Sequence, residues 1–301
     1  MSDGGGFGAL VARRVEERRS QIVLGLDPDP GRLWPQSAAA AGGGTGAQAA
    51  ATAVAHHCRG LIEAAGEACV AVKPQLACFE RLGAAGRKAL GETCRAAREA
   101  GLLGIADGKR GDIDVSAAAY AAALFSGFDT PFGRVDGLGA DAATVNPYMG
   151  IDTLETFAEV AAGSGAGLFV LVRTSNPGAA DFEDLPTGDG AVWERVAAAV
   201  SALGGDGPGL SAVGAVLGAT EPEHLARARE LMPSAIFLLP GVGAQGGSVE
   251  ALAPAFAPGP AGGLVTASRS IANAGEASGS DPAQAAREEA ERLRDLAWSL
   301  S

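Results

Sequence analysis

The sequence is short of positive charge. Its 301 residues include 23 lysines and arginines against 35 aspartates and glutamates, a formal net charge of -12 at pH 7. An acidic surface repels a phosphate backbone, so the composition argues against nucleic acid as a partner. A phosphorylated substrate would need locally placed cations, which makes each lysine or arginine in a loop informative.

Long apolar runs are also missing. Residues 1–21 contain no apolar segment of the signal-peptide type. No later run approaches the roughly 20 apolar residues that a membrane-spanning helix needs. We therefore expect a cytoplasmic protein with no membrane partner.

Cysteine is scarce, and its spacing is not that of a zinc site. The chain has four, at Cys58, Cys69, Cys78 and Cys94. Cys69 and Cys78 lie in apolar segments, as small core residues do. His56, His57 and Cys58 look metal-binding in isolation, but they lie in an alanine-rich helical stretch and no second cluster completes a site. We predict no structural metal.

The sequence does have a regular alternation of apolar strands and amphipathic helices. The predicted strands cover residues 21–26, 68–72, 102–106, 142–145, 167–172, 212–217, 235–239 and 263–267. The predicted helices include residues 7–19, 77–100, 116–125, 153–162, 191–203, 221–232, 249–256 and 282–300. Eight strands alternating with helices predict an α/β protein with a single (β/α)8 TIM barrel. No linker divides the chain, so we predict one domain over residues 1–301. It would carry an N-terminal helix at 7–19 and an Ala/Gly-rich insertion around 37–55, which runs into a helix ending near residue 66.

The third predicted strand ends in an unusual cluster of charge. Asp107, Lys109, Arg110 and Asp112 follow its apolar residues within six positions. In a strand, residues two apart project from the same face, so Asp107 and Lys109 would converge. A solvated turn after a strand is the ordinary alternative for such a pattern.

The other predicted strands also end in polar residues. In chain order these are Asp27, Lys73, Asn146, Ser175, the glycine loop at 241–247, and Arg269. Active sites of such barrels are built at the carboxyl ends of the strands, so we expect these groups to share one rim.

The glycine loop fits the G-x-G-x-x-G pattern of dinucleotide-binding folds. That fold would require further β-α units downstream and an acidic residue about twenty positions on. Only one predicted strand remains, and no acid stands at that distance. Loops after strands 7 and 8 of a barrel commonly bind phosphate through backbone N–H groups, and Arg269 would supply the cation. We predict a phosphate site.

These motifs, taken together, resemble the orotidine 5'-phosphate decarboxylase family, which carries out the last step of UMP synthesis. The resemblance spans about residues 20 to 275 and rests on ADGKRGDI at 106–113, GLDP at 25–28, VKP at 72–74, SNPGA at 175–179, GVGAQGG at 241–247 and SRSI at 268–271. The length, NPYMG at 146–150 and the Ser-Arg pair at 268–269 resemble the longer bacterial branch.

The resemblance implies a role for each matching position. Lys73, Asp107, Lys109 and Asp112 would form an alternating charge network around the reacting carbon, with Lys109 as the proton donor. Asp27 and Lys73 would hold the ribose, Ser175 the pyrimidine edge, and Gln245 and Arg269 the phosphate. The remaining implied substrate contacts are Ile113, Ser116, Asn146, Pro240, Gly241, Gly247 and Ser268.

The family also implies how the chain assembles. Asp112, Ile113 and Ser116 would complete the neighbouring subunit's site, so a homodimer is expected. Ser116 stands where shorter members carry threonine, which keeps the hydroxyl, and Ser268 stands where they carry glycine. No cofactor and no metal are implied.

The implied chemistry agrees with these residue types. Loss of CO2 from C6 of orotidine 5'-monophosphate leaves a carbanion that no adjacent π system delocalises. A fixed cation is needed at that carbon, and a lysine between two carboxylates can serve and then donate its proton.

Two alternatives remain open. One is a Mg-dependent sugar-phosphate decarboxylase or aldolase of the same superfamily, although Lys73 stands where those relatives hold their metal with an acid. The other is a non-catalytic nucleotide-binding barrel.

Overall fold

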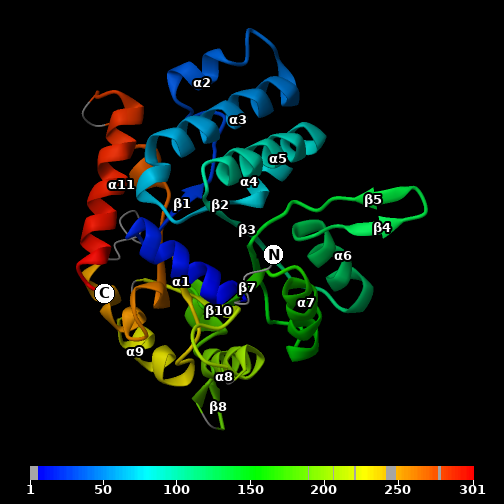
Figure 1. The fold of residues 1–301 in the computed structure, drawn as a ribbon, viewed down its shortest axis with the longest axis vertical. Helices are drawn as coiled ribbons and strands as arrows, with labels where there is room; N and C mark the ends of the chain where they lie inside the picture. Colours follow the sequence, from blue (N-terminus) through cyan, green and yellow to red (C-terminus); the bar gives the residue numbers. More distant parts are fainter. Residues whose placement is uncertain (1–5, 189, 206, 220–221, 242–248, 277–278) are drawn as a thin grey trace.

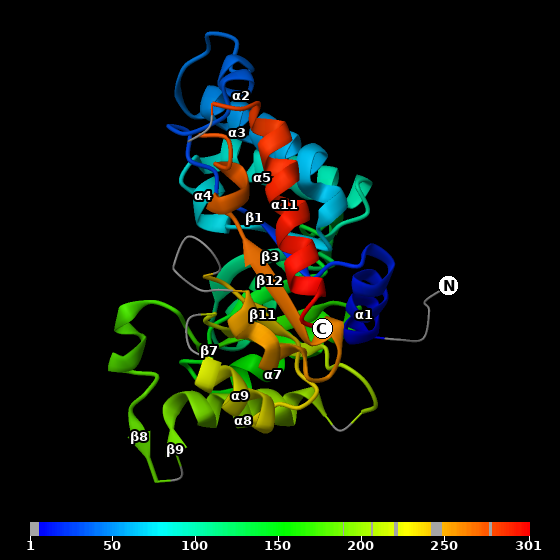
Figure 2. The ribbon, with the colours of Figure 1, turned by 90° about the vertical axis from the view of Figure 1, so that its left-hand side faces the viewer.

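The computed structural model describes residues 6–301 apart from 189, 206, 220–221, 242–248 and 277–278. Within these residues, eight parallel strands close a barrel in the order β1-β12-β11-β10-β7-β6-β3-β2 (Figures 1 and 2). They are β1 (Ile22–Leu26), β2 (Ala71–Pro74), β3 (Leu103–Arg110), β6 (Ala142–Val145), β7 (Gly167–Arg173), β10 (Val213–Leu217), β11 (Phe237–Leu239) and β12 (Gly263–Ala267). The predicted (β/α)8 barrel is confirmed.

Helices surround the barrel, and α3 packs between α5 and α11 on one side of it (Figure 1). The α-helices are α1 (Phe7–Arg18), α2 (Pro35–Ala39), α3 (Gly46–Ala65), α4 (Leu76–Glu80), α5 (Gly83–Glu99), α6 (Asp114–Leu124), α7 (Ile151–Gly163), α8 (Val192–Gly204), α9 (Pro222–Leu231), α10 (Arg269–Ala272) and α11 (Pro282–Trp298). Short 3-10 helices among the described residues are η1 (Gly66–Ala68), η2 (Pro177–Asp181), η3 (Glu250–Phe256) and η4 (Pro260–Gly262).

Strand alternation divides the buried residues into two cores. On β7, Phe169 faces the barrel interior with Val23, Ile105 and Leu238, whereas its neighbour Val170 packs in the outer core against the helices. Both faces of each strand are therefore apolar, which is why the strands read as continuous apolar runs in the sequence.

Helix α1 covers the end of the barrel opposite the predicted site. Phe7 belongs to the interior core with Val11 and Val15, and its ring meets Phe169 edge-on at 6.0 Å between centroids. A Cβ atom on Gly167 would lie 2.1 Å from the Phe7 ring, so only glycine fits there. The amino-terminal end of the barrel is closed by packing, which leaves the carboxyl ends of the strands for a site.

Three local features differ from the sequence predictions. Strand β3 continues through the charge cluster to Arg110, instead of ending at 106. The helix expected over 77–100 is two helices, α4 and α5, and the second begins at Gly83, whose φ of 62° favours glycine. Residues 250–256 form a 3-10 helix that contains Pro254.

Two hairpins were not predicted. Strands β4 (Phe128–Thr130) and β5 (Gly133–Val135) form one, which extends from the barrel beside α6 (Figure 1), and β8 (Pro186–Thr187) with β9 (Gly190–Ala191) forms the other. Strands of two or three residues are too short for a recognisable period.

The Ala/Gly-rich residues 37–55 cover most of α2, a turn and the first half of α3. Ala51 and Val54 of this part are buried in the outer core. That the stretch is an insertion stays a prediction. Among the described residues, no helix combines the length and apolar character that crossing a membrane requires.

Candidate active site

The residues predicted for the rim lie at the carboxyl ends of neighbouring strands. Gly25 of β1 is the register partner of Lys73 in β2, and Ala267 of β12 pairs with β1 on its other side. A cavity of about 540 Å³ opens at this end of the barrel. Its lining includes Lys73, Asp107, Lys109, Thr144, Ser175 and Pro240.

Strand β3 is irregular where its charges lie. Ala106 pairs with Ala143 of β6 and Arg110 pairs with Val145, so the three residues 107–109 stand opposite Thr144 alone. Lys109 adopts a φ of 46°, which is uncommon for a residue with a side chain. Asp107 and Lys109 do meet, as predicted, but through a bulge and not through regular strand alternation.

The Asp107 carboxylate is the centre of the hydrogen-bonded cluster. Lys73 Nζ donates to Oδ2, and Lys109 Nζ donates to Oδ1 at 2.6 Å. The Thr144 hydroxyl donates to Oδ1 at 2.9 Å, and Gln75 Nε2 lies 3.3 Å from Oδ2. Each carboxylate oxygen thus has two donors.

The two lysines differ in exposure. The Lys73 side chain is 9% exposed and that of Asp107 is 6%, whereas Lys109 is 43% exposed. Lys73 and Asp107 therefore form a buried base for the cluster. Lys109 is the cation that a molecule in the cavity would meet.

The Asp107 carboxyl is more acidic than an ordinary aspartate, because two lysines stabilise its ionised form. Burial alone would raise the pKa of this carboxyl, but Lys73 and Lys109 outweigh burial and lower the pKa to about 2. The carboxylate is ionised at neutral pH.

The loop after β7 forms one wall of the cavity. Arg173 makes a bidentate pair with Asp184, at 2.8 Å for each of the two N–O contacts. Glu183 accepts hydrogen bonds from both the backbone N–H and the hydroxyl of Thr174, each at 2.8 Å. These contacts fix the loop that carries Ser175 into the cavity lining.

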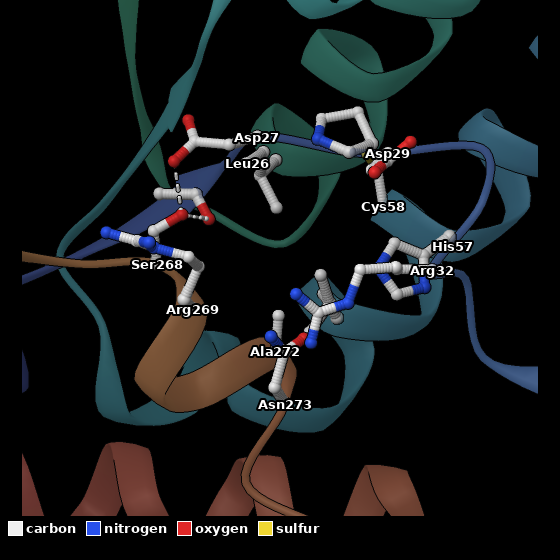
Figure 3. A pocket seen from close by; sticks show the side chains of 13 residues that line it. Leu26, Asp27, Asp29, Arg32, His57, Cys58, Ser268, Arg269, Ala272 and Asn273 are labelled. Carbon is white, nitrogen blue, oxygen red and sulfur yellow. Dashed lines mark hydrogen bonds between the residues drawn. The ribbon is translucent and has the colours of Figure 1, made fainter. Parts of the chain in front are cut away.

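A second cavity, of about 170 Å³, opens at the ends of β1 and β12 (Figure 3). Asp27, Ser268 and Arg269 lie together on one side of it, and Ser268 Oγ lies 2.5 Å from Asp27 Oδ2 and 3.2 Å from the Gly25 carbonyl oxygen. Arg32 lies on the other side, paired with Glu276 at 2.8 Å.

His57 borders the same cavity but has a structural role. The Trp34 backbone N–H donates to His57 Nδ1 at 3.3 Å, and the two rings meet edge-on. Burial, with a smaller effect of His56, lowers the pKa of His57 to about 4, so the imidazole is neutral at pH 7. In the described part of the chain, no three or more His, Cys, Asp and Glu side chains gather where they could hold a metal ion.

Known proteins of similar sequence identify the family of this chain. The profile of the family described as orotidine 5'-phosphate decarboxylase / HUMPS matches residues 20–288. A curated Deinococcus radiodurans protein named orotidine 5'-phosphate decarboxylase is 42% identical over 294 residues, which are 96% of each chain. The chain belongs to the orotidine 5'-phosphate decarboxylase family.

Solved structures agree with that assignment. A Leishmania donovani orotidine 5'-monophosphate (OMP) decarboxylase aligns with a TM-score of 0.73 at 34% identity. The alignment covers 97% of this chain and 99% of the Leishmania chain. A Streptomyces avermitilis structure aligns with a TM-score of 0.80 at 32% identity. The alignment covers 98% of this chain and 95% of the Streptomyces chain. The predicted family and the predicted enzyme class are both confirmed.

The residues predicted to complete a neighbouring subunit's site lie outside the two cavities of their own chain. Asp112 Oδ1 accepts a hydrogen bond from the Ile113 N–H at 2.9 Å, and neither residue lines either of the two cavities. Ile113 is 53% exposed, and Ser116 is exposed in the first turn of α6. Within one chain the charge network thus has three members, Lys73, Asp107 and Lys109.

The remaining predicted substrate contacts are spread along the rim. Ser175 and Pro240 line the larger cavity. Asn146 Oδ1 instead accepts from the Tyr148 N–H at 2.9 Å. Gly241, with a φ of 106°, follows Pro240, and the predicted Gln245 and Gly247 lie outside the described residues.

Sequence reasoning did not find Thr144, Gln75 or Glu183, all of which contact the cluster or the cavity wall. Thr144 is a lone hydroxyl in the apolar strand AATV, at the end facing the charges. A polar residue in such a strand is a usable signal, because buried hydroxyls need hydrogen-bond partners.

Proposed function

We propose that this chain converts orotidine 5'-monophosphate to UMP and CO2 in pyrimidine biosynthesis, without a cofactor and in the cytoplasm. The observation that carries the proposal is the Lys73–Asp107–Lys109 cluster in the lining of the larger cavity. The names of the relatives support the same reaction.

Lys109 would carry the chemistry. When the bond between C6 and the carboxylate breaks, its electron pair stays on C6 and CO2 leaves. The Lys109 ammonium stabilises that charge and transfers a proton to C6, after which solvent reprotonates the amine. The 43% exposure of Lys109 makes it available to the substrate, and its 2.6 Å contact with Asp107 fixes where the ammonium stands.

The buried pair would supply preorganisation. Asp107 is held by Lys73, Lys109 and Thr144, so the cation needs no reorganisation when charge develops on the substrate. Ser175 and Pro240 would contact the pyrimidine, and Asp27 with Lys73 the ribose. Arg269 would bind the phosphate with Gln245.

The direct test is the loss of substrate absorbance, with UMP identified by chromatography and EDTA present. Cofactor-free decarboxylation predicts turnover that EDTA leaves unchanged. Activity that EDTA abolishes would favour the Mg-dependent relatives, and tight UMP binding without turnover would favour a non-catalytic barrel.

Arg269→Ala should raise the KM for the substrate about 10- to 100-fold, because hydrogen bonds to a charged group contribute about 1.5–3 kcal/mol. The affinity for UMP should fall in parallel, and that for uridine should not. Arg32→Ala is the matched control, since Arg32 borders the same cavity but pairs with Glu276. An unchanged KM in Arg269→Ala would place the phosphate elsewhere.

The proposal includes a homodimer in which Asp112 completes the partner's site. Large exposed apolar side chains follow Asp112 in the sequence and stand at the start of α7 and just before it, as expected of an interaction surface. They are Ile113 (53% exposed), Val115 (83%), Tyr148 (86%), Met149 (45%) and Ile151 (53%). Helices α6 and α7, which carry or adjoin them, pack against each other.

Mixing two inactive variants tests the shared site. Lys109→Ala and Asp112→Asn should each be nearly inactive, yet co-expressed they should recover about a quarter of wild-type turnover. Half of the randomly formed dimers are mixed, and one of their two sites is intact.

Lys73→Ala mixed with Lys109→Ala is the matched control. Both lysines belong to one chain's cluster, so each mixed dimer has a defect in both sites and no recovery is expected. Recovery in neither mixture would show that Asp112 does not act across subunits.

A further inference from the structure

Thr144 occupies the interruption in the ladder between β3 and β6. Three residues of β3, from Asp107 to Lys109, stand opposite it, so regular backbone pairing is lost there. The Thr144 side chain replaces that pairing. Its Oγ1 accepts a hydrogen bond from the Lys109 backbone N–H at 3.0 Å and donates one to Asp107 Oδ1 at 2.9 Å.

One hydroxyl therefore joins the two residues that set the position of the cation. Thr144 is 1% exposed, so water does not compete for these bonds. Asp107 Oδ1, which accepts the Thr144 proton, also accepts from Lys109 Nζ. Oγ1 thus holds Lys109 at its backbone directly and at its ammonium through the carboxylate.

The backbone of Lys109 needs such support. A φ of 46° costs a side-chain-bearing residue free energy, and such a conformation persists only when its surroundings hold it. The N–H of Lys109 donates to Thr144 Oγ1, because the bulge removes the backbone acceptor that a regular strand would offer.

We propose that Thr144 is a positioning residue for the decarboxylation: its hydroxyl sets the bulge that aims the Lys109 ammonium into the cavity. This inference rests on the proposed function. Because Thr144 acts through Lys109, its loss should lower kcat far more than it weakens binding of the ground state.

Thr144→Val is the isosteric test. We expect kcat to fall about 10- to 100-fold, because two hydrogen bonds that position the reacting group are lost. KM and the affinity for UMP should stay within about twofold of wild type. Thr144→Ser keeps the hydroxyl and should stay within about threefold of wild-type kcat.

Thr93→Val is the matched control, because Thr93 is also 1% exposed and donates to a backbone carbonyl at 2.9 Å, far from the cavity, in α5. Wild-type kcat in Thr144→Val, or an equal loss in Thr144→Ser and Thr144→Val, would overturn the inference. If Thr144→Val does not fold, the comparison is made between Thr144→Ala and Thr144→Ser. Absence of turnover in the wild type would instead reject the proposed function itself.

Discussion

Lys109→Ala should lose at least about 10⁴-fold in turnover while the barrel stays folded. A positioned proton donor contributes about 10²–10⁴-fold, and a preorganised charge at the reacting atom contributes a further 10²–10³-fold. Lys109 supplies both, since its ammonium is the exposed cation of the cluster in the cavity. The measurement is single-turnover conversion of the substrate, beside wild type.

The fold should tolerate this truncation. Lys109 is 43% exposed, and Asp107 would keep its contacts with Lys73 and Thr144. Lys88→Ala is the matched control, because Lys88 is a 72% exposed lysine that pairs with Glu92 on α5. Near-wild-type turnover by a folded Lys109→Ala protein would remove Lys109 from the mechanism.

Asp107→Asn should be both unstable and inactive. The amide keeps the shape of the carboxylate but leaves the 9% exposed Lys73 ammonium without a countercharge. Breaking a buried pair in this way costs about 3–5 kcal/mol in the free energy of unfolding. Turnover should also fall by at least about 10²-fold, because Lys109 loses the charged acceptor that positions it.

The same substitution tests the acidity of Asp107. Its pKa is lowered to about 2, from an ordinary 3.8, so the pair stabilises the folded state fully above the unfolded pKa. That contribution, on the order of 2 kcal/mol, is lost as pH falls from about 4 through 2. Wild-type stability should therefore decline across this window more steeply than that of Asp107→Asn.

Urea unfolding at pH 7 and between pH 4 and 2 measures both effects. Asp129→Asn is the control, because Asp129 is 84% exposed and pairs with Arg134 on the β4–β5 hairpin, away from the cavity. Equal stability of Asp107→Asn and wild type at pH 7 would contradict the assigned role of the buried pair.

Much of the fold could be predicted because local patterns determine it. The eight barrel strands were found within a few residues, since continuous apolar runs between glycines and polar ends are typical of strands buried on both faces. The break between α4 and α5 and the two hairpins were missed. They depend on a single glycine conformation at Gly83 and on strands of two or three residues.

The sequence by itself determined the chemistry available at the rim: Lys73, Asp107, Lys109 and Arg269 each stand at a strand end, in motifs of one family. Only the tertiary structure decided how they meet. The bulge at 107–109 and its bond to Thr144 depend on the register between β3 and β6. That register depends on contacts between residues far apart in the sequence, such as Asp107 and Thr144, which are separated by 37 positions. No local sequence pattern encodes such contacts.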